Sequence, residues 1–199
     1  MSDYMVEQTT GRTVVRYKPI VVAIHWLTAA LILWQVYLGF TFHDMTRGTP
    51  ERGEMFAWHK TVGATILLLA LIRLAVRLIN PPPPYPDDLP KWERFVAVWN
   101  HRIFYFLIVA LPLTGLAAVS GRAEDGTVAL LWGLSLPAIP GIPEENGLGG
   151  VHEWLVYITL ALLVIHVTAA LKHQFFMPNR VAGRMPPFRT GPDNDSAAG

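Results

Sequence analysis

The residues best suited to chemistry in this sequence are its seven histidines, because the chain contains no cysteine. The absence of cysteine excludes disulfides, thiolate zinc sites, iron–sulfur clusters and cofactors attached through thioether bonds. Neutral imidazole is a strong ligand for transition metals. Six of the histidines fall inside long apolar stretches of the chain, namely His25, His59, His101, His152, His166 and His173. An ionisable side chain in such a stretch is costly and by default indicates a functional site.

Four apolar stretches must position these histidines, at residues 20–42, 55–79, 99–120 and 151–176. Each is long enough to span a bilayer, which takes about 20 residues of helix. The composition agrees, since the chain is 52% hydrophobic and 16% charged, against about 25% charged in average soluble domains. We therefore predict an all-α integral membrane protein, a four-helix up-down bundle.

The positive residues predict the orientation of these helices. If both termini lie on one side, that side holds twelve of the sixteen Lys and Arg residues. Both termini are therefore expected in the cytoplasm. This gives a cytoplasmic N-terminal segment, 1–19, one transmembrane domain, 20–176, and a cytoplasmic tail, 177–199, expected to be disordered from its Pro, Gly and polar content. Prolines 81–84 end the second span, and residues 128–132, too short to cross, are expected at the membrane interface.

The spacing of His152 and His166 is the strongest signal for a site. Fourteen residues of helix rise about 21 Å and return to nearly the same face, so the two imidazoles point one way at two depths. At the outer depth His59 can pair with His152, and at the cytoplasmic depth His25 can pair with His166. Haem iron in an electron-transfer site takes two axial ligands, and neutral imidazole suits it. We therefore expect two non-covalent haem b groups, each between two histidines.

The same fourteen-residue step recurs on the other helices. It leads from His25 to Gly39, from His59 to Arg73 and from His101 to Gly115. A glycine beside a haem removes a side chain that would clash, and Gly63, one turn after His59, can serve the same end. Arg73 is expected near the inner haem, where its guanidinium can pair with a propionate.

Two histidines keep alternative interpretations. His101 either contacts the inner haem or only hydrogen-bonds a propionate or a loop. His173, two turns after His166, either contacts a quinone or is an interfacial histidine. His43, next to Asp44, is expected to be exposed.

At these positions the chain resembles the bacterial cytochrome b561 family, from about residue 17 to residue 187. The matching stretches are Ile24-His25-Trp26-Leu27, Trp58-His59-Lys60, Asn100-His101-Arg102, Val151-His152-Glu153-Trp154, Ile165-His166-Val167 and Leu171-Lys172-His173. The resemblance implies two haem b groups, with His25 and His166 as ligands of one and His59 and His152 as ligands of the other. It also implies quinone as an electron partner. In some members the outer substrate is superoxide, which is oxidised to dioxygen while the electron passes to ubiquinone near the cytoplasmic side.

These observations predict transmembrane electron transfer between an outer-side donor and membrane quinone, in the bacterial inner membrane. Whether the chain is an oxidoreductase of the superoxide:ubiquinone type or an electron-transfer cytochrome stays open. One alternative is a non-catalytic cytochrome b subunit of a larger dehydrogenase or hydrogenase complex, and another is a proton or metal transporter that uses histidines. The net charge of +1 and the lack of a basic run give no indication of nucleic-acid binding.

Electrostatic arguments point to two different outer donors. Under the predicted orientation the outer side holds four Lys and Arg residues against eight Asp and Glu residues. This acidic balance repels superoxide and favours a basic soluble donor. Lys60, with Arg47 and Arg52, can nevertheless form a local positive funnel over the outer haem.

Overall fold

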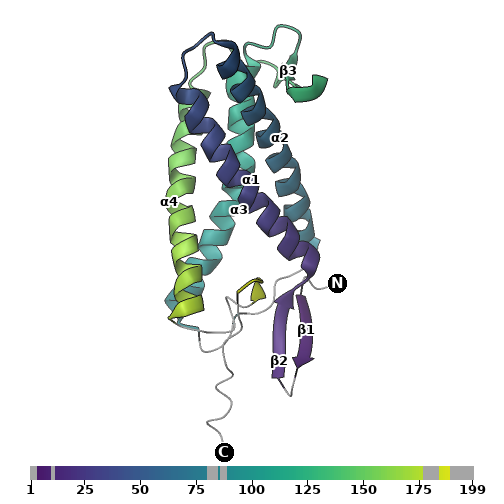
Figure 1. Cartoon of the computed structure of the whole chain (residues 1–199), viewed down its shortest axis with the longest axis vertical. Coiled ribbons are helices and arrows are strands. Elements are labelled where there is room, and N and C mark those ends of the chain that lie inside the picture. Colours follow the sequence, from purple (N-terminus) through teal and green to yellow (C-terminus); the bar gives the residue numbers. More distant parts are fainter. Residues whose placement is uncertain (1–3, 10–11, 80–84, 86–88, 177–183, 189–199) are drawn as a thin grey trace, which may run out of the picture. The chain divides into compact units, whose positions relative to one another are not determined.

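A computed structural model describes residues 4–9, 12–79, 85, 89–176 and 184–188, and its side chains from Arg16 onward. Within these residues four helices are long and apolar enough to cross a membrane. They are α1 (Pro19–Asp44), α2 (Pro50–Ile79), α3 (Lys91–Ser120) and α4 (Leu148–Phe175), and Figure 1 labels them. The four predicted spans are therefore confirmed.

Two of the helices begin earlier than the apolar stretches predicted. Helix α2 begins at Pro50 rather than near residue 55, because proline suits the first helical turn and the Thr49 hydroxyl accepts a hydrogen bond from the Arg52 backbone N–H at 3.4 Å. Helix α3 begins at Lys91 rather than near residue 99. Its first two turns contain too many polar residues to appear as part of an apolar stretch. They include the buried carboxylate of Glu93.

The chain divides into two compact units, each of which takes a segment from all four helices. The terminal unit comprises Met1–His25, Arg73–Ile103 and Leu160–Gly199, and the distal unit comprises Trp26–Ile72 and Phe104–Thr159. Helices α1 and α3 run from the terminal to the distal unit, whereas α2 and α4 run back. The chain order therefore alternates in direction, as an up-down bundle requires.

The helices carry their large apolar side chains outward. Leu33 of α1, Leu68 of α2, Phe106 of α3 and Val164 of α4 are each 60–66% exposed. Such exposure is expected where lipid rather than water covers the helix surface. Buried apolar packing in the distal unit centres on Leu38, Val62 and Ile66, against which Leu31, Ile32, Met55 and Trp58 pack.

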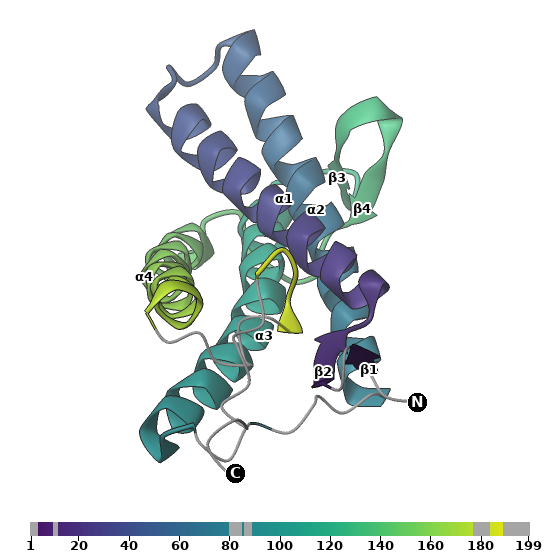
Figure 2. The ribbon, with the colours of Figure 1, turned by 60° about the horizontal axis from the view of Figure 1, so that its bottom comes forward.

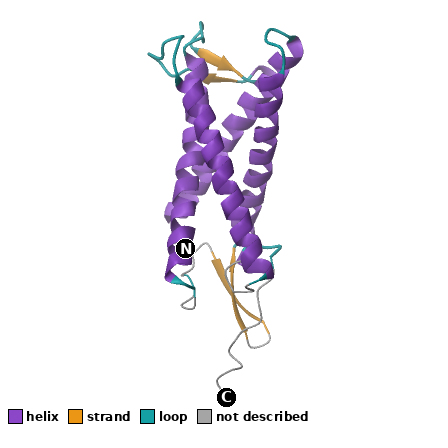
Figure 3. Cartoon of the chain, turned by 90° about the vertical axis from the view of Figure 1, so that its left-hand side faces the viewer, coloured by secondary structure: helices purple, strands orange, loops and turns teal. Residues whose placement is uncertain are grey.

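Two short antiparallel hairpins, which were not predicted from the sequence, accompany the four-helix bundle. In the terminal unit β1 (Tyr4–Thr9) pairs with β2 (Arg12–Tyr17). In the distal unit β3 (Thr127–Ala129) pairs with β4 (Ser135–Pro137) around a 3₁₀ turn, Leu131–Gly133. Figure 2 labels all four strands, and Figure 3 separates them from the helices by colour.

The β3–β4 hairpin contains residues 128–132, the short segment expected at the membrane interface. It is tied to α2, since the Leu131 backbone N–H donates to the Thr61 hydroxyl at 3.0 Å and the Trp132 ring lies 5.4 Å from that of Trp58.

The expected tail, 177–199, falls largely outside the described residues. Its described part, 184–188, includes the buried side chain of Arg184. The proline run at 81–84 also lies outside them, although α2 ends at Ile79, where that run was expected to stop it.

Candidate haem sites

In the distal unit a histidine pair joins α2 to α4. The ring centres of His59 and His152 lie 6.3 Å apart, and their planes are nearly perpendicular, at 81°. Both side chains are partly buried. The predicted outer pair is therefore brought together.

The terminal unit holds a second pair, which joins α1 to α4. The ring centres of His25 and His166 lie 6.5 Å apart, with an angle of 52° between their planes. The predicted inner pair is also brought together, so each unit contains one pair.

The spacing of both pairs fits two imidazoles bound on opposite sides of one metal ion. An imidazole nitrogen binds a transition metal at about 2.1 Å and lies about 1.2 Å from its own ring centre, so two such rings have centres about 6.5 Å apart. The observed 6.3 and 6.5 Å agree with this value. Within the described residues no group of three or more His, Cys, Asp or Glu side chains could hold a metal ion. Two axial ligands suit haem, whose porphyrin supplies the remaining ligands.

Hydrogen bonds hold the His152 ring in place. Its Nδ1 lies 2.9 Å from the Leu111 carbonyl oxygen and 3.3 Å from the Thr114 hydroxyl. Donation from Nδ1–H to that carbonyl fixes the tautomer in which Nε2 carries the lone pair. In this tautomer the ring can bind iron through Nε2.

Two of the predicted glycines lie against the distal pair. A Cβ at Gly39 would be 3.2 Å from His59 Cε1, and a Cβ at Gly115 would be 3.2 Å from His152 Cε1. Any larger residue at either position would press on a ring of the pair. Gly63 faces a different neighbour, because a Cβ there would be 3.1 Å from Nε2 of Gln35.

Gln35 is a site residue that the sequence did not indicate. Its amide nitrogen lies 3.1 Å from His59 Nε2 and donates to the His59 carbonyl oxygen at 3.0 Å. Binding of iron through Nε2 of His59 requires the Gln35 amide to release that nitrogen. A polar residue inside an apolar span was the available signal.

Arg73 and His101 both lie beside the terminal pair. Nη2 of Arg73 is 3.0 Å from Nδ1 of His25. Since arginine can only donate, iron on Nε2 of that ring would require Arg73 to turn away and would leave a guanidinium available for an anion. The His101 ring centre is 5.6 Å from that of His166, and His101 Nδ1 lies 2.7 Å from the Ala97 carbonyl oxygen.

His173 faces a buried carboxylate rather than the pair. Its Nε2 lies 3.4 Å from Oε2 of Glu93, and Nζ of the neighbouring Lys172 lies 3.0 Å from Oε1 of the same side chain. Glu93 is another residue that sequence reasoning missed. His43, as expected, is exposed.

Two cations lie on aromatic rings close to His59. The Phe42 ring lies 5.1 Å from the His59 ring and 5.0 Å from that of Phe56. The Arg52 guanidinium is 5.5 Å from the centre of Phe42, and the Lys60 ammonium is 5.2 Å from the centre of Phe56. Positive charge therefore gathers beside the distal pair.

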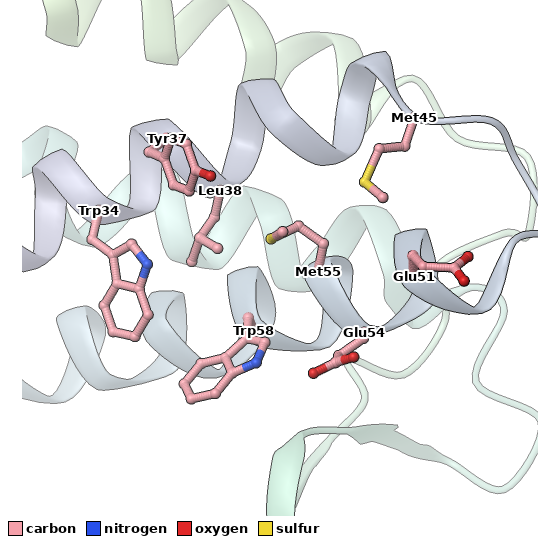
Figure 4. Close-up of a pocket in the computed structure, with 8 residues that line it drawn as sticks. All are labelled: Trp34, Tyr37, Leu38, Met45, Glu51, Glu54, Met55 and Trp58. Carbon is pink, nitrogen blue, oxygen red and sulfur yellow. The ribbon is translucent and has the colours of Figure 1, made fainter.

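The distal unit also contains a cavity of about 330 Å³ between α1 and α2, which Figure 4 shows. Its lining residues are Trp34, Tyr37, Leu38, Met45, Glu51, Glu54, Met55 and Trp58. None of the paired histidines lines this cavity, so it is separate from the candidate haem site.

Comparison with known proteins identifies the family. The sequence profile described as prokaryotic cytochrome b561 matches residues 16–187. The chain is 28% identical to cytochrome b561 homolog 2 of Escherichia coli (strain K12), across 85% of this chain and 90% of that protein. It is 25% identical to the probable superoxide oxidase CybB of Yersinia pestis, across 88% and 98%. It is also 25% identical to cytochrome b562 of Cereibacter sphaeroides, across 85% and 94%.

A profile match over most of the chain agrees with the four spans and with the histidines that they bring together. The chain therefore belongs to the prokaryotic cytochrome b561 family and is a bacterial multi-pass membrane cytochrome that binds haem b and transfers electrons.

Proposed function

We propose that this protein carries electrons across the bacterial inner membrane through two haem b groups, from an outer-side donor to membrane quinone. The observation that carries the proposal is the presence of one histidine pair in each unit, at 6.3 and 6.5 Å between ring centres. One pair alone would support a single haem and would not supply two redox positions at different depths.

The four ligands in this proposal are His59 and His152 in the distal unit and His25 and His166 in the terminal unit. Bound haem supplies one-electron redox chemistry, and the protein supplies ligation, orientation and charge. His152 is oriented by the Leu111 carbonyl, and Gly39 and Gly115 leave room beside the two distal rings. Arg73, at 3.0 Å from His25, is suited to pair with a haem propionate once it releases the ring.

The proposed orientation puts the terminal unit on the cytoplasmic side. It rests on the twelve Lys and Arg residues that accompany the termini and on the positive-inside rule. Quinone is then reduced beside the terminal pair, where His173 is the candidate hydrogen-bond donor to the quinone head and His101 contributes to the same surroundings.

Superoxide is the donor that we favour. A relative is named a probable superoxide oxidase, and an electron from superoxide leaves dioxygen as the product. The Arg52 and Lys60 side chains near His59 supply the local positive charge that attracts an anion, even though the loops of the distal side are acidic overall.

A salt titration tests this choice of donor. If the local charge governs capture, superoxide-driven haem reduction is fast at low salt, slows as salt is added, and falls several-fold in Lys60→Glu, because screening acts over about 8 Å at physiological ionic strength. A slow reaction that accelerates with salt would show that the acidic loops dominate. In that case a basic soluble donor replaces superoxide in the proposal.

Two other functions remain distinguishable from this one. A non-catalytic subunit of a larger dehydrogenase would copurify with a large partner. A histidine-based transporter would be colourless when pure. The pairing of the histidines at the spacing of axial ligands favours the cytochrome over the transporter.

A further inference from the structure

We propose that Glu93 is the proton-delivery residue for quinone reduction, acting through His173. The inference rests on the proposed reduction of quinone beside the terminal pair. It gives a function to a buried carboxylate that haem binding does not require.

The geometry places the carboxylate between two partners from one helix. Glu93 lies in the first turn of α3 and is 8% exposed. Its Oε1 is 3.0 Å from Nζ of Lys172, and its Oε2 is 3.4 Å from Nε2 of His173, whose side chain is 15% exposed. Among the residues that the structure describes, Lys172 and His173 of α4 make ion-pair contacts with this carboxylate.

Burial of the Glu93 carboxylate costs free energy, and one neighbouring cation can offset that cost. A buried carboxylate is strongly unfavourable unless it is paired, and Lys172 supplies that pairing at Oε1. Neutralisation of the charge therefore does not require the second contact, between Oε2 and His173. This contact places the carboxylate 3.4 Å from an imidazole nitrogen, on a side chain that can take up and release protons.

The residues on either side of Glu93 suit a membrane interface. Trp92 and Phe95, on either side of Glu93 in α3, are each 63% exposed. Large exposed aromatic side chains are typical of the membrane interface. Helix α3 therefore presents an apolar surface beside Glu93, of the kind along which a lipid-soluble quinone would approach.

The proton balance assigns a role to each ring nitrogen. Reduction of a quinone to a hydroquinone takes two electrons, one at a time from haem, and two protons. In our proposal one quinone oxygen takes the Nδ1 proton of neutral His173 while Nε2 of the same ring takes the proton of the Glu93 carboxylic acid, so the ring stays neutral and Glu93 is left as a carboxylate beside Lys172. Uptake of one proton from the cytoplasm restores the Glu93 carboxylic acid and the Nδ1–H tautomer of the imidazole. A second cycle supplies the second proton.

The competing explanation is a clamp, in which Glu93 only fastens the start of α3 to the end of α4. Lys172→Met perturbs the clamp directly, because it removes the contact at Oε1 and leaves the carboxyl group facing His173 without its cation. Glu93→Gln keeps the shape of the side chain and removes its acid–base function. Glu93→Asp restores a carboxyl group.

The experiment measures the reoxidation of dithionite-reduced protein by a soluble ubiquinone analogue and, separately, by ferricyanide, which takes an electron without a proton. We expect Glu93→Gln to slow quinone reoxidation at least about tenfold, since general acid–base catalysis contributes about 10²–10⁴-fold. Reoxidation by ferricyanide should be unchanged. Glu93→Asp should recover most of the rate. Lys172→Met, which leaves the buried carboxyl group unpaired, should lower thermal stability more than Glu93→Gln does and slow quinone reoxidation less.

The outcomes distinguish failure of this inference from failure of the proposed function on which it rests. If quinone fails to oxidise the parent protein, the proposed function is wrong and the inference falls with it. If quinone oxidises the parent and Glu93→Gln equally fast, only the inference is overturned. Equal slowing in Glu93→Gln and Lys172→Met, or slowing of ferricyanide as well, identifies a structural clamp and also overturns the inference.

Discussion

Addition of a single methyl group at Gly115 should weaken the distal haem and leave the terminal haem intact. The Cβ of Gly115→Ala would lie 3.2 Å from Cε1 and 3.3 Å from Nδ1 of His152, closer than ordinary contact at 3.4–4 Å. The ring must therefore move by a few tenths of an ångström. It is not free to do so, because the Leu111 carbonyl holds its Nδ1 at 2.9 Å.

The expected cost follows from this conflict. Overpacking a closely packed site costs about 1–3 kcal/mol, which corresponds to about 5–150-fold weaker haem binding at the distal pair. Helix α3 itself should not suffer, because alanine is favoured over glycine in a helix by about 1 kcal/mol. The loss should therefore appear in haem affinity rather than in helix content.

The assay is a haem titration or competitive haem loss, followed by visible spectroscopy and redox titration so that the two haems are resolved. Gly149→Ala is the control, since it lies in the same helix as His152 and an added Cβ there meets nothing within 4 Å. Equal loss of both haems in Gly115→Ala, or an equal effect in Gly149→Ala, would refute the reasoning.

Two further predictions concern the terminal unit. His173→Ala should slow haem reoxidation by quinone by about tenfold or more while both haems stay bound, and stopped-flow kinetics with unchanged rates would remove His173 from the quinone site. Arg73→Leu should lower retention of the terminal haem, because the guanidinium lies 3.0 Å from His25 and is the proposed partner of a propionate. Haem content and redox titration check this, and equal effects on both haems would count against the placement of Arg73.

The sequence predicted the histidine pairs because helical geometry converts spacing into depth. Fourteen residues return a helix to nearly the same face, so His152 and His166 could be matched with partners on other helices before any coordinates were known. The same argument led to Gly39 and Gly115, which the structure places against histidine rings.

Residues outside that pattern could not be found in the same way. The polar character of Gln35 was visible, but its contact with His59 depends on the packing of α1 against α2. Glu93 precedes the predicted third span, 99–120. Only the extension of α3 back to Lys91 brings its carboxylate against His173. The hairpins β1–β2 and β3–β4 are short, and pairing between short strands is weakly encoded by pattern alone.

The most direct test of the two-haem account is a reduced-minus-oxidised visible spectrum of the pure protein, with haem quantified per chain in the parent and in two ligand variants. The account predicts two haem b groups per chain in the parent, both six-coordinate and low-spin. His152→Ala should retain one haem, at the terminal pair, and His166→Ala should retain one haem, at the distal pair. A colourless parent, a parent with one haem, or a variant that keeps two six-coordinate haems would contradict the account.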